Sequence, residues 1–118
     1  MKAKDVLGRQ GEELAARFLA DKGYRILERN WRCPLGEIDL IAEYLGVTVF
    51  VEVKTRSGLQ YGHPFEAITI AKLARLRKLS RAWCDAAASG QRQIRIDAIA
   101  VVALRSKPVT VEHLVGIF

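Results

Sequence analysis

The sequence predicts an α/β fold with the element order α-β-β-β-α-β(-β), arranged as a sandwich around a mixed central sheet. Two stretches, residues 5–22 and about 65–88, have the apolar spacing of amphipathic helices. The other apolar runs are short, rich in β-branched and aromatic residues, and bounded by glycine or proline, which is typical of strands. Half of the 118 residues are hydrophobic, so we expect one domain, residues 1–118, with its own core.

The first helix is expected over residues 5–22 and ends at Gly23. At about 100° per residue, its apolar face is formed by Leu14, Ala15, Phe18 and Leu19. Glu12 falls at the rim of this face, from which it can reach the edge of the sheet, whereas Glu13 points to solvent. The helix dipole favours an acid in the first turns of any helix, so an ordinary structural role for Glu12 remains open.

Three strands are expected next, over residues 24–32, 37–44 and 47–56, and the third holds two charged residues in an apolar run. Side chains alternate across a strand, so Glu52 and Lys54 point to one face and the valines of the run to the other. Asp39 lies on the preceding strand, which can pair antiparallel with this one. Two carboxylates and a lysine at one sheet edge can hold a divalent cation and orient a water molecule, which is the chemistry of a metal-dependent phosphodiesterase. A partly buried Glu52–Lys54 ion pair is the alternative.

The second helix is expected to bury Leu73, Leu76, Leu79 and Trp83. Residues 54–81 carry seven basic side chains and one acidic side chain, in a protein of net charge +6. Such a concentration suits a phosphate backbone, although basic helix faces are often only solvated. Lys72 lies on the buried side in angular terms, so it either snorkels to solvent or points toward the Glu52–Lys54 face. The candidates for nucleic-acid binding are Arg56, Lys72, Arg75, Lys78 and Arg81.

The remaining residues indicate no other chemistry. Strands are expected over residues 93–104 and 109–114, with Asp97 and Arg95 forming an ion pair. His63 and His113 lack partners at metal or triad spacing and are expected at the surface. Cys33 and Cys84 are expected to be reduced thiols of a cytoplasmic protein. No stretch approaches the ~20 apolar residues of a membrane span, and the N-terminus is not expected to be a signal peptide.

The motifs together resemble those of a known family. They are Gly8-Arg9-Gln10-Gly11-Glu12, Gly23-Tyr24-Arg25-Ile26-Leu27 with Arg29-Asn30, Gly36-Glu37-Ile38-Asp39-Leu40-Ile41-Ala42 and Phe50-Val51-Glu52-Val53-Lys54-Thr55-Arg56. In this combination the chain resembles the bacterial YraN family, predicted nucleases similar to archaeal Holliday-junction resolvases. The resemblance implies a restriction-endonuclease-like fold, whose site is an acid followed by Glu-x-Lys. Asp39, Glu52 and Lys54 match that pattern, Glu12 matches the helical glutamate of the resolvases, and Ile38 rather than proline precedes Asp39.

The resemblance and the residues together predict a metal-dependent endonuclease that hydrolyses phosphodiester bonds in DNA, in branched or single-stranded structures. Asp39 and Glu52 would ligate Mg²⁺ or Mn²⁺, with Glu12 holding a second ion or a water molecule. Lys54 would position the attacking water or stabilise developing charge. A homodimer would match a symmetric branched substrate. The alternatives are a nucleic-acid-binding module that acts through a partner and, with less support, a purely structural protein.

Overall fold

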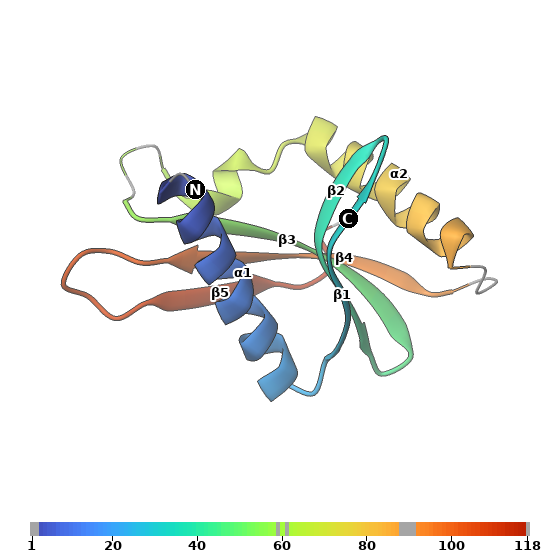
Figure 1. The fold of residues 1–118 in the computed structure, drawn as a ribbon, viewed down its shortest axis with the longest axis horizontal. Helices are drawn as coiled ribbons and strands as arrows, with labels where there is room; N and C mark the ends of the chain where they lie inside the picture. The colour runs from blue at the N-terminus through green and yellow to red at the C-terminus, as the bar shows by residue number, and fades with distance from the viewer. Residues whose placement is uncertain (1–2, 59, 61, 88–91, 118) are drawn as a thin grey trace.

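Figure 1 shows the computed structural model, which describes residues 3–58, 60, 62–87 and 92–117. The predicted order of helices and strands is confirmed. The elements are α1 (Ala3–Asp21), β1 (Arg25–Cys33), β2 (Gly36–Tyr44), β3 (Val47–Arg56), the short 3-10 helix η1 (Pro64–Ala67), α2 (Ile70–Ala86), β4 (Ile94–Val102) and β5 (Thr110–Leu114).

The five strands form one mixed sheet in the order β1-β2-β3-β4-β5. Neighbouring strands run antiparallel except β3 and β4, which are parallel. Parallel neighbours need a crossover connection, and the segment containing η1 and α2 provides it. The predicted mixed sheet is therefore confirmed.

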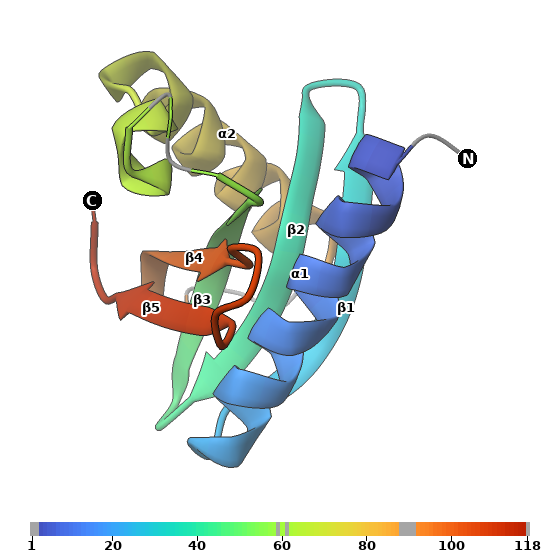
Figure 2. The ribbon, with the colours of Figure 1, turned by 90° about the vertical axis from the view of Figure 1, so that its left-hand side faces the viewer.

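The two helices pack on opposite faces of the sheet, as Figures 1 and 2 show. Strand β3 contributes to both cores, since Val49, Val51 and Val53 pack with α1 and Phe50 packs with α2. This alternation agrees with the sequence pattern. The α1 side of the core also contains Ala15, Ala16, Leu19, Leu40, Ile99 and Val101, and the α2 side contains Ile38, Ile41, Leu76, Leu79, Trp83 and Ile96.

Two details of the helices differ from the predictions. In α1, Leu14 is exposed and Ala16 is buried, so the packed face is turned slightly from the predicted one. The predicted second helix begins too early, because η1 and the extended residues Ile68 and Thr69 precede α2. The Thr69 hydroxyl accepts a hydrogen bond from the Lys72 amide at 3.2 Å and so caps the new helix start. The predicted end of this helix, Ala88, lies outside the described residues.

Neither helix is both long enough and apolar enough to cross a membrane, over the part of the chain that the structure describes. Cys33 and Cys84 are both free thiols, as predicted.

Candidate active site

The site forms where strands β2 and β3 separate. The last paired residues of the two strands are Leu40 and Val51. One step further along, the Asp39 carboxylate accepts a hydrogen bond from the Val53 amide at 2.8 Å. A side chain thus satisfies a backbone donor that the neighbouring strand no longer reaches, which fixes the Asp39 carboxylate between the two strands.

Glu52 and Lys54 lie on one face of β3, as the alternation predicts. The Lys54 ammonium lies 3.6 Å from a carboxylate oxygen of Glu52, and less than a fifth of either side chain is exposed. The ion pair that was the alternative interpretation is therefore present. It does not neutralise the region, because Asp39 adds a second carboxylate beside Glu52.

The crowding of these acids is visible in the pKa of Asp39, which is raised from 3.8 to about 8. Burial is the largest cause, and the negative charge of Glu52 is the next. The Val53 amide acts in the opposite direction, since its hydrogen bond favours the charged carboxylate. Without a cation beside it, Asp39 is therefore largely protonated at neutral pH. Hard divalent cations prefer oxygen ligands, so this donor set suits Mg²⁺ or Mn²⁺.

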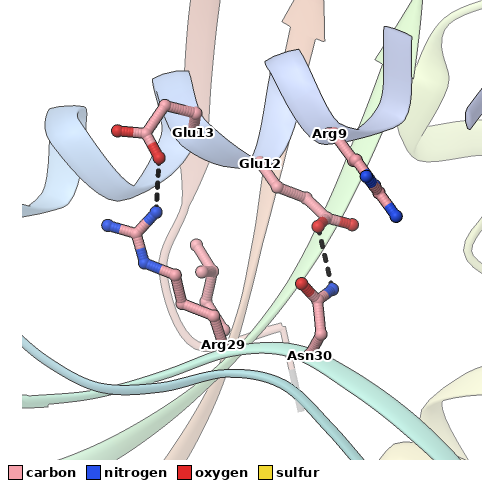
Figure 3. A pocket seen from close by; sticks show the side chains of 6 residues that line it. Arg9, Glu12, Glu13, Arg29 and Asn30 are labelled. Carbon is pink, nitrogen blue, oxygen red and sulfur yellow. Dashed lines mark hydrogen bonds and ion pairs between the residues drawn. The ribbon is translucent and has the colours of Figure 1, made fainter. Parts of the chain in front are cut away.

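Glu12 is near this pair but has a different hydrogen-bond partner. Its carboxylate accepts a hydrogen bond from the Asn30 side-chain amide at 2.8 Å (Figure 3). The same amide donates to Glu37 at 2.9 Å. The negative charge of Glu12 still contributes to the raised pKa of Asp39. Within the described residues, however, no three His, Cys, Asp or Glu side chains are grouped so that they could hold one metal ion. The structure thus pairs Asp39 with Glu52 and leaves Glu12 at the side.

Asn30 was not among the predicted site residues. Its backbone has a φ of 50°, a left-handed conformation that Asn tolerates better than most residues. With Glu12 it lines a pocket of about 200 Å³ between α1 and the β1–β2 hairpin, together with Arg9, Glu13, Arg29 and Leu40. Glu13, predicted to be solvated, is half-exposed and pairs with Arg29 across this pocket (Figure 3). Only the presence of Asn30 within one of the family motifs could have singled it out.

The Lys72 ammonium lies beside that of Lys54, so this side chain reaches the site while staying partly exposed. The Lys54 ammonium beside it is the main cause of a lowered pKa of Lys72, and Glu52 opposes that effect. Lys72 is half-buried in the first turn of α2, three residues after the capping Thr69. Asp39, Glu52, Lys54 and Lys72 together are called the Asp39–Glu52 site below. It brings two carboxylates and two ammonium groups to one place.

The other predicted nucleic-acid contacts lie along or near α2. Arg75, Lys78 and Arg81 are exposed, as predicted, and Arg56 is half-buried at the end of β3. Lys78 and Arg81 also line a hollow of about 590 Å³ at the C-terminal half of α2, here called the α2 hollow. Its other lining residues are Arg77, Cys84, Asp85, Arg92 and Ile94.

The prediction for His113 was wrong. Its side chain is only 2% exposed, and its ring bonds the fully buried Asp97 carboxylate at 2.7 Å. Arg95 and the Gly116 amide also donate to Asp97, so the predicted Arg95–Asp97 ion pair is confirmed. His63 is partly exposed and lies 3.3 Å from Glu112.

Comparison with known proteins finds similar chains of one family. The sequence profile of the uncharacterised protein family UPF0102 matches residues 11–101, which include the Asp39–Glu52 site and all of α2. A UPF0102 protein of Beutenbergia cavernae is 50% identical over 117 residues, 99% of each chain. One of Paenarthrobacter aurescens is 51% identical over 117 residues, 99% of this chain and 97% of its own. One of Clavibacter michiganensis subsp. michiganensis is 53% identical over 106 residues, 90% of each chain.

Proposed function

The chain belongs to the uncharacterised protein family UPF0102, the YraN family, and we propose that it is a metal-dependent endonuclease that hydrolyses phosphodiester bonds in branched or single-stranded DNA. The observation that carries the proposal is the placement of Asp39 against Glu52 at the separation of β2 and β3. The Lys54 ammonium pairs with Glu52, whereas Asp39 is in none of the ion pairs of the described residues and keeps a raised pKa. Two half-buried carboxylates side by side are therefore better satisfied by a cation that contacts both. Adjacent, partly buried carboxylates of this kind are expected in a site that binds a metal ion.

Asp39 and Glu52 would hold Mg²⁺ or Mn²⁺, whose remaining positions water and the phosphate would fill. When bound, the ion supplies the charge that polarises a phosphodiester and lowers the pKa of a nearby water molecule. Glu12 lies at the side of this pair and would orient a water molecule through its position beside Asn30.

The two lysines would act on the phosphate group. Lys54 is held against Glu52 and can donate to the attacking water or to a phosphate oxygen. Lys72 comes from another element and would bind the same phosphate from the α2 side. Two adjacent ammonium groups repel each other, and a phosphate between them would relieve that repulsion. The free thiols of Cys33 and Cys84 are in keeping with a protein of the cytoplasm.

Cleavage of labelled DNA by the purified protein tests the proposal. Four-way junction, flap, single-stranded and duplex DNA would each be incubated with Mg²⁺, Mn²⁺ or EDTA. We expect cutting that needs a metal ion and disappears in Glu52→Ala and Asp39→Asn. Glu43→Ala is the matched control, because Glu43 lies on the same strand as Asp39 but is paired with Arg25 at the surface. Equal cutting by the Glu52→Ala and Glu43→Ala variants would refute the assignment.

The alternative is a nucleic-acid-binding module that keeps the nuclease fold and acts through a partner. One observation favours it, namely that Glu12 does not complete a three-carboxylate group with Asp39 and Glu52 in the described residues. The same experiment decides between the two. Binding of DNA without cutting, by both the wild type and Glu52→Ala, would support the module.

A further inference from the structure

The α2 hollow has a strong excess of positive charge. Three of its cations, Arg77, Lys78 and Arg81, are exposed within about one and a third turns of α2. Asp85 is the one carboxylate among the described residues that line the hollow. A concave surface lined by one sign of charge focuses the electrostatic potential more strongly than a convex helix face does. The hollow is therefore better suited to a polyanion than the rest of the outer face of α2.

The fourth cation of the hollow comes from a different element and is held in place. Arg92 precedes β4, and its guanidinium donates to the Thr48 hydroxyl at 3.2 Å. The same group lies 5.1 Å from the ring centre of Trp83, within the range of a cation–π interaction. Arg92 is thus held in place at the hollow, whereas the cations of the helix are exposed. A guanidinium held in this way has less conformational entropy to lose when it binds an anion.

The α2 hollow and the Asp39–Glu52 site lie along the same helix. Lys72 belongs to the site, and Arg81 follows it by nine residues, which is about 13 Å along the helix axis. At about 100° per residue, these nine residues place Lys72 and Arg81 on opposite sides of the helix, and Arg75 and Lys78 continue the row diagonally from one side to the other. A strand of DNA that crosses α2 along this row, over at least about four nucleotides, can contact both places.

We propose that the α2 hollow binds a backbone phosphate of DNA at a distance from the cut and so anchors the strand that enters the Asp39–Glu52 site. The proposal rests on the function proposed above for the site, but the binding step itself needs no cleavage. Arg92 and Arg77 then join Lys78 and Arg81 as contacts to the phosphate backbone. Because the contacts are to phosphate, they position the DNA without reading its sequence.

The test compares two double variants that remove the same charge. Lys78→Gln/Arg81→Gln neutralises the α2 hollow. Arg105→Gln/Lys107→Gln neutralises two exposed residues of the β4–β5 turn, at the opposite end of the molecule from the end of α2 (Figure 1). Affinity for a fluorescent DNA duplex would be measured by anisotropy over a series of salt concentrations, in EDTA so that no DNA is cut. Circular dichroism would confirm that both variants are folded.

We expect the hollow variant to bind the duplex at least about tenfold more weakly than the wild type does. The slope of the logarithm of affinity against the logarithm of salt concentration should become about one to two units less steep, because each lost phosphate contact removes about 0.9 from it. The control variant should stay within about twofold of the wild type, because its charges lie far from the strand and are screened by salt. Equal losses in the two variants would overturn the proposal, since the effect would then come from net charge alone.

A further comparison separates DNA from free phosphate as the ligand. Sodium phosphate and sodium chloride of equal ionic strength should displace the duplex equally from the wild type. Stronger displacement by phosphate that disappears in the hollow variant would identify a small-anion site and overturn the assignment to DNA. The binding of the duplex is measured in EDTA and needs no cleavage, so a failure of the cleavage test would not affect the comparison of the two double variants.

Discussion

The α-carbon of Gly11 lies so close to the side chain of Thr55 that no β-carbon fits between them. A β-carbon on Gly11 would lie 1.9 Å from the Thr55 hydroxyl oxygen, 2.8 Å from its methyl carbon and 2.9 Å from its β-carbon. Helix α1 therefore rests directly on the end of β3 at this point. Glu12 is the next residue, so the same contact brings its carboxylate to the edge of the Asp39–Glu52 site.

Gly11→Ala should destabilise the protein by about 1–3 kcal/mol, because α1 must move away from β3 or Thr55 must leave its rotamer. Gly8→Ala is the matched control in the same helix, since a β-carbon there meets nothing within 4 Å. The control should be neutral or stabilise by up to about 1 kcal/mol, as alanine favours helix. Urea unfolding of both variants measures the difference. Equal free energies of unfolding for Gly11→Ala and Gly8→Ala would show that Gly11 does not pack tightly against Thr55.

Asp39→Asn should stabilise the protein at high pH when no divalent cation is present. The folded-state pKa of Asp39 is about 8 and its ordinary value is 3.8, so the folded state binds the proton more tightly than the unfolded state does. Folding therefore becomes less favourable as the pH rises from about 4 to about 8, where the unfolded state has already lost its proton. Asparagine carries no charge, and its side-chain oxygen can still accept from the Val53 amide.

Urea unfolding of the wild type and Asp39→Asn at pH 5, 7 and 9 in EDTA tests this prediction. The free energy of unfolding of the variant, relative to that of the wild type, should increase from the lowest to the highest pH. A difference in this free energy that does not change with pH would mean that Asp39 titrates near its ordinary value. Added Mg²⁺ should raise the midpoint of the wild type and leave that of the variant almost unchanged, because binding to the folded state alone is stabilising.

The sequence predicts those parts of the site that depend on one strand. The alternating pattern of residues 47–56 defines β3 and puts Glu52 and Lys54 on one face, and both are found in the structure. The position of Lys72 depends instead on η1 and the break before α2. The apolar residues of η1 resemble a helical pattern, so the sequence predicts one uninterrupted helix and leaves the direction of Lys72 open.

Contacts between distant segments are the part that the sequence does not predict. His113 bonds Asp97 across β5 and β4, and nothing in the local pattern of either strand indicates that both side chains are buried. The partner of Glu12 likewise depends on how the β1–β2 hairpin meets α1, which brings Asn30 to it. In both cases the hydrogen bond follows from tertiary packing, which sequence periodicity does not determine.

Asp97→Asn should destabilise the protein by about 3–5 kcal/mol at neutral pH, because it removes the negative charge that a buried cluster is built around. Arg95, His113 and the Gly116 amide all donate to this carboxylate and lower its pKa, against the opposing effect of burial. A lowered pKa contributes stability above the ordinary value of 3.8, and that stability is lost as the pH falls through the folded-state pKa.

The difference in the free energy of unfolding between the wild type and Asp97→Asn should therefore become smaller at acid pH. Unfolding in urea at pH 7, 5 and 3 measures it. Asp85→Asn is the control, because Asp85 is exposed at the end of α2 and should cost little at any of these pH values. A difference that stays the same down to pH 3 would contradict the lowered pKa of Asp97.

Lys72→Gln should reduce the rate of cleavage by about tenfold or more, because it removes a charge aimed at the phosphate in the site. Arg75→Gln removes the same charge from an exposed position less than one turn further along α2, and should mainly weaken binding. Single-turnover cleavage at saturating protein separates the two effects, since saturation compensates for weaker binding. The rate of Arg75→Gln should then recover while that of Lys72→Gln stays low. If both rates recover, Lys72 contributes only to the attraction of DNA, and Lys54 is the lysine that acts on the reacting phosphate.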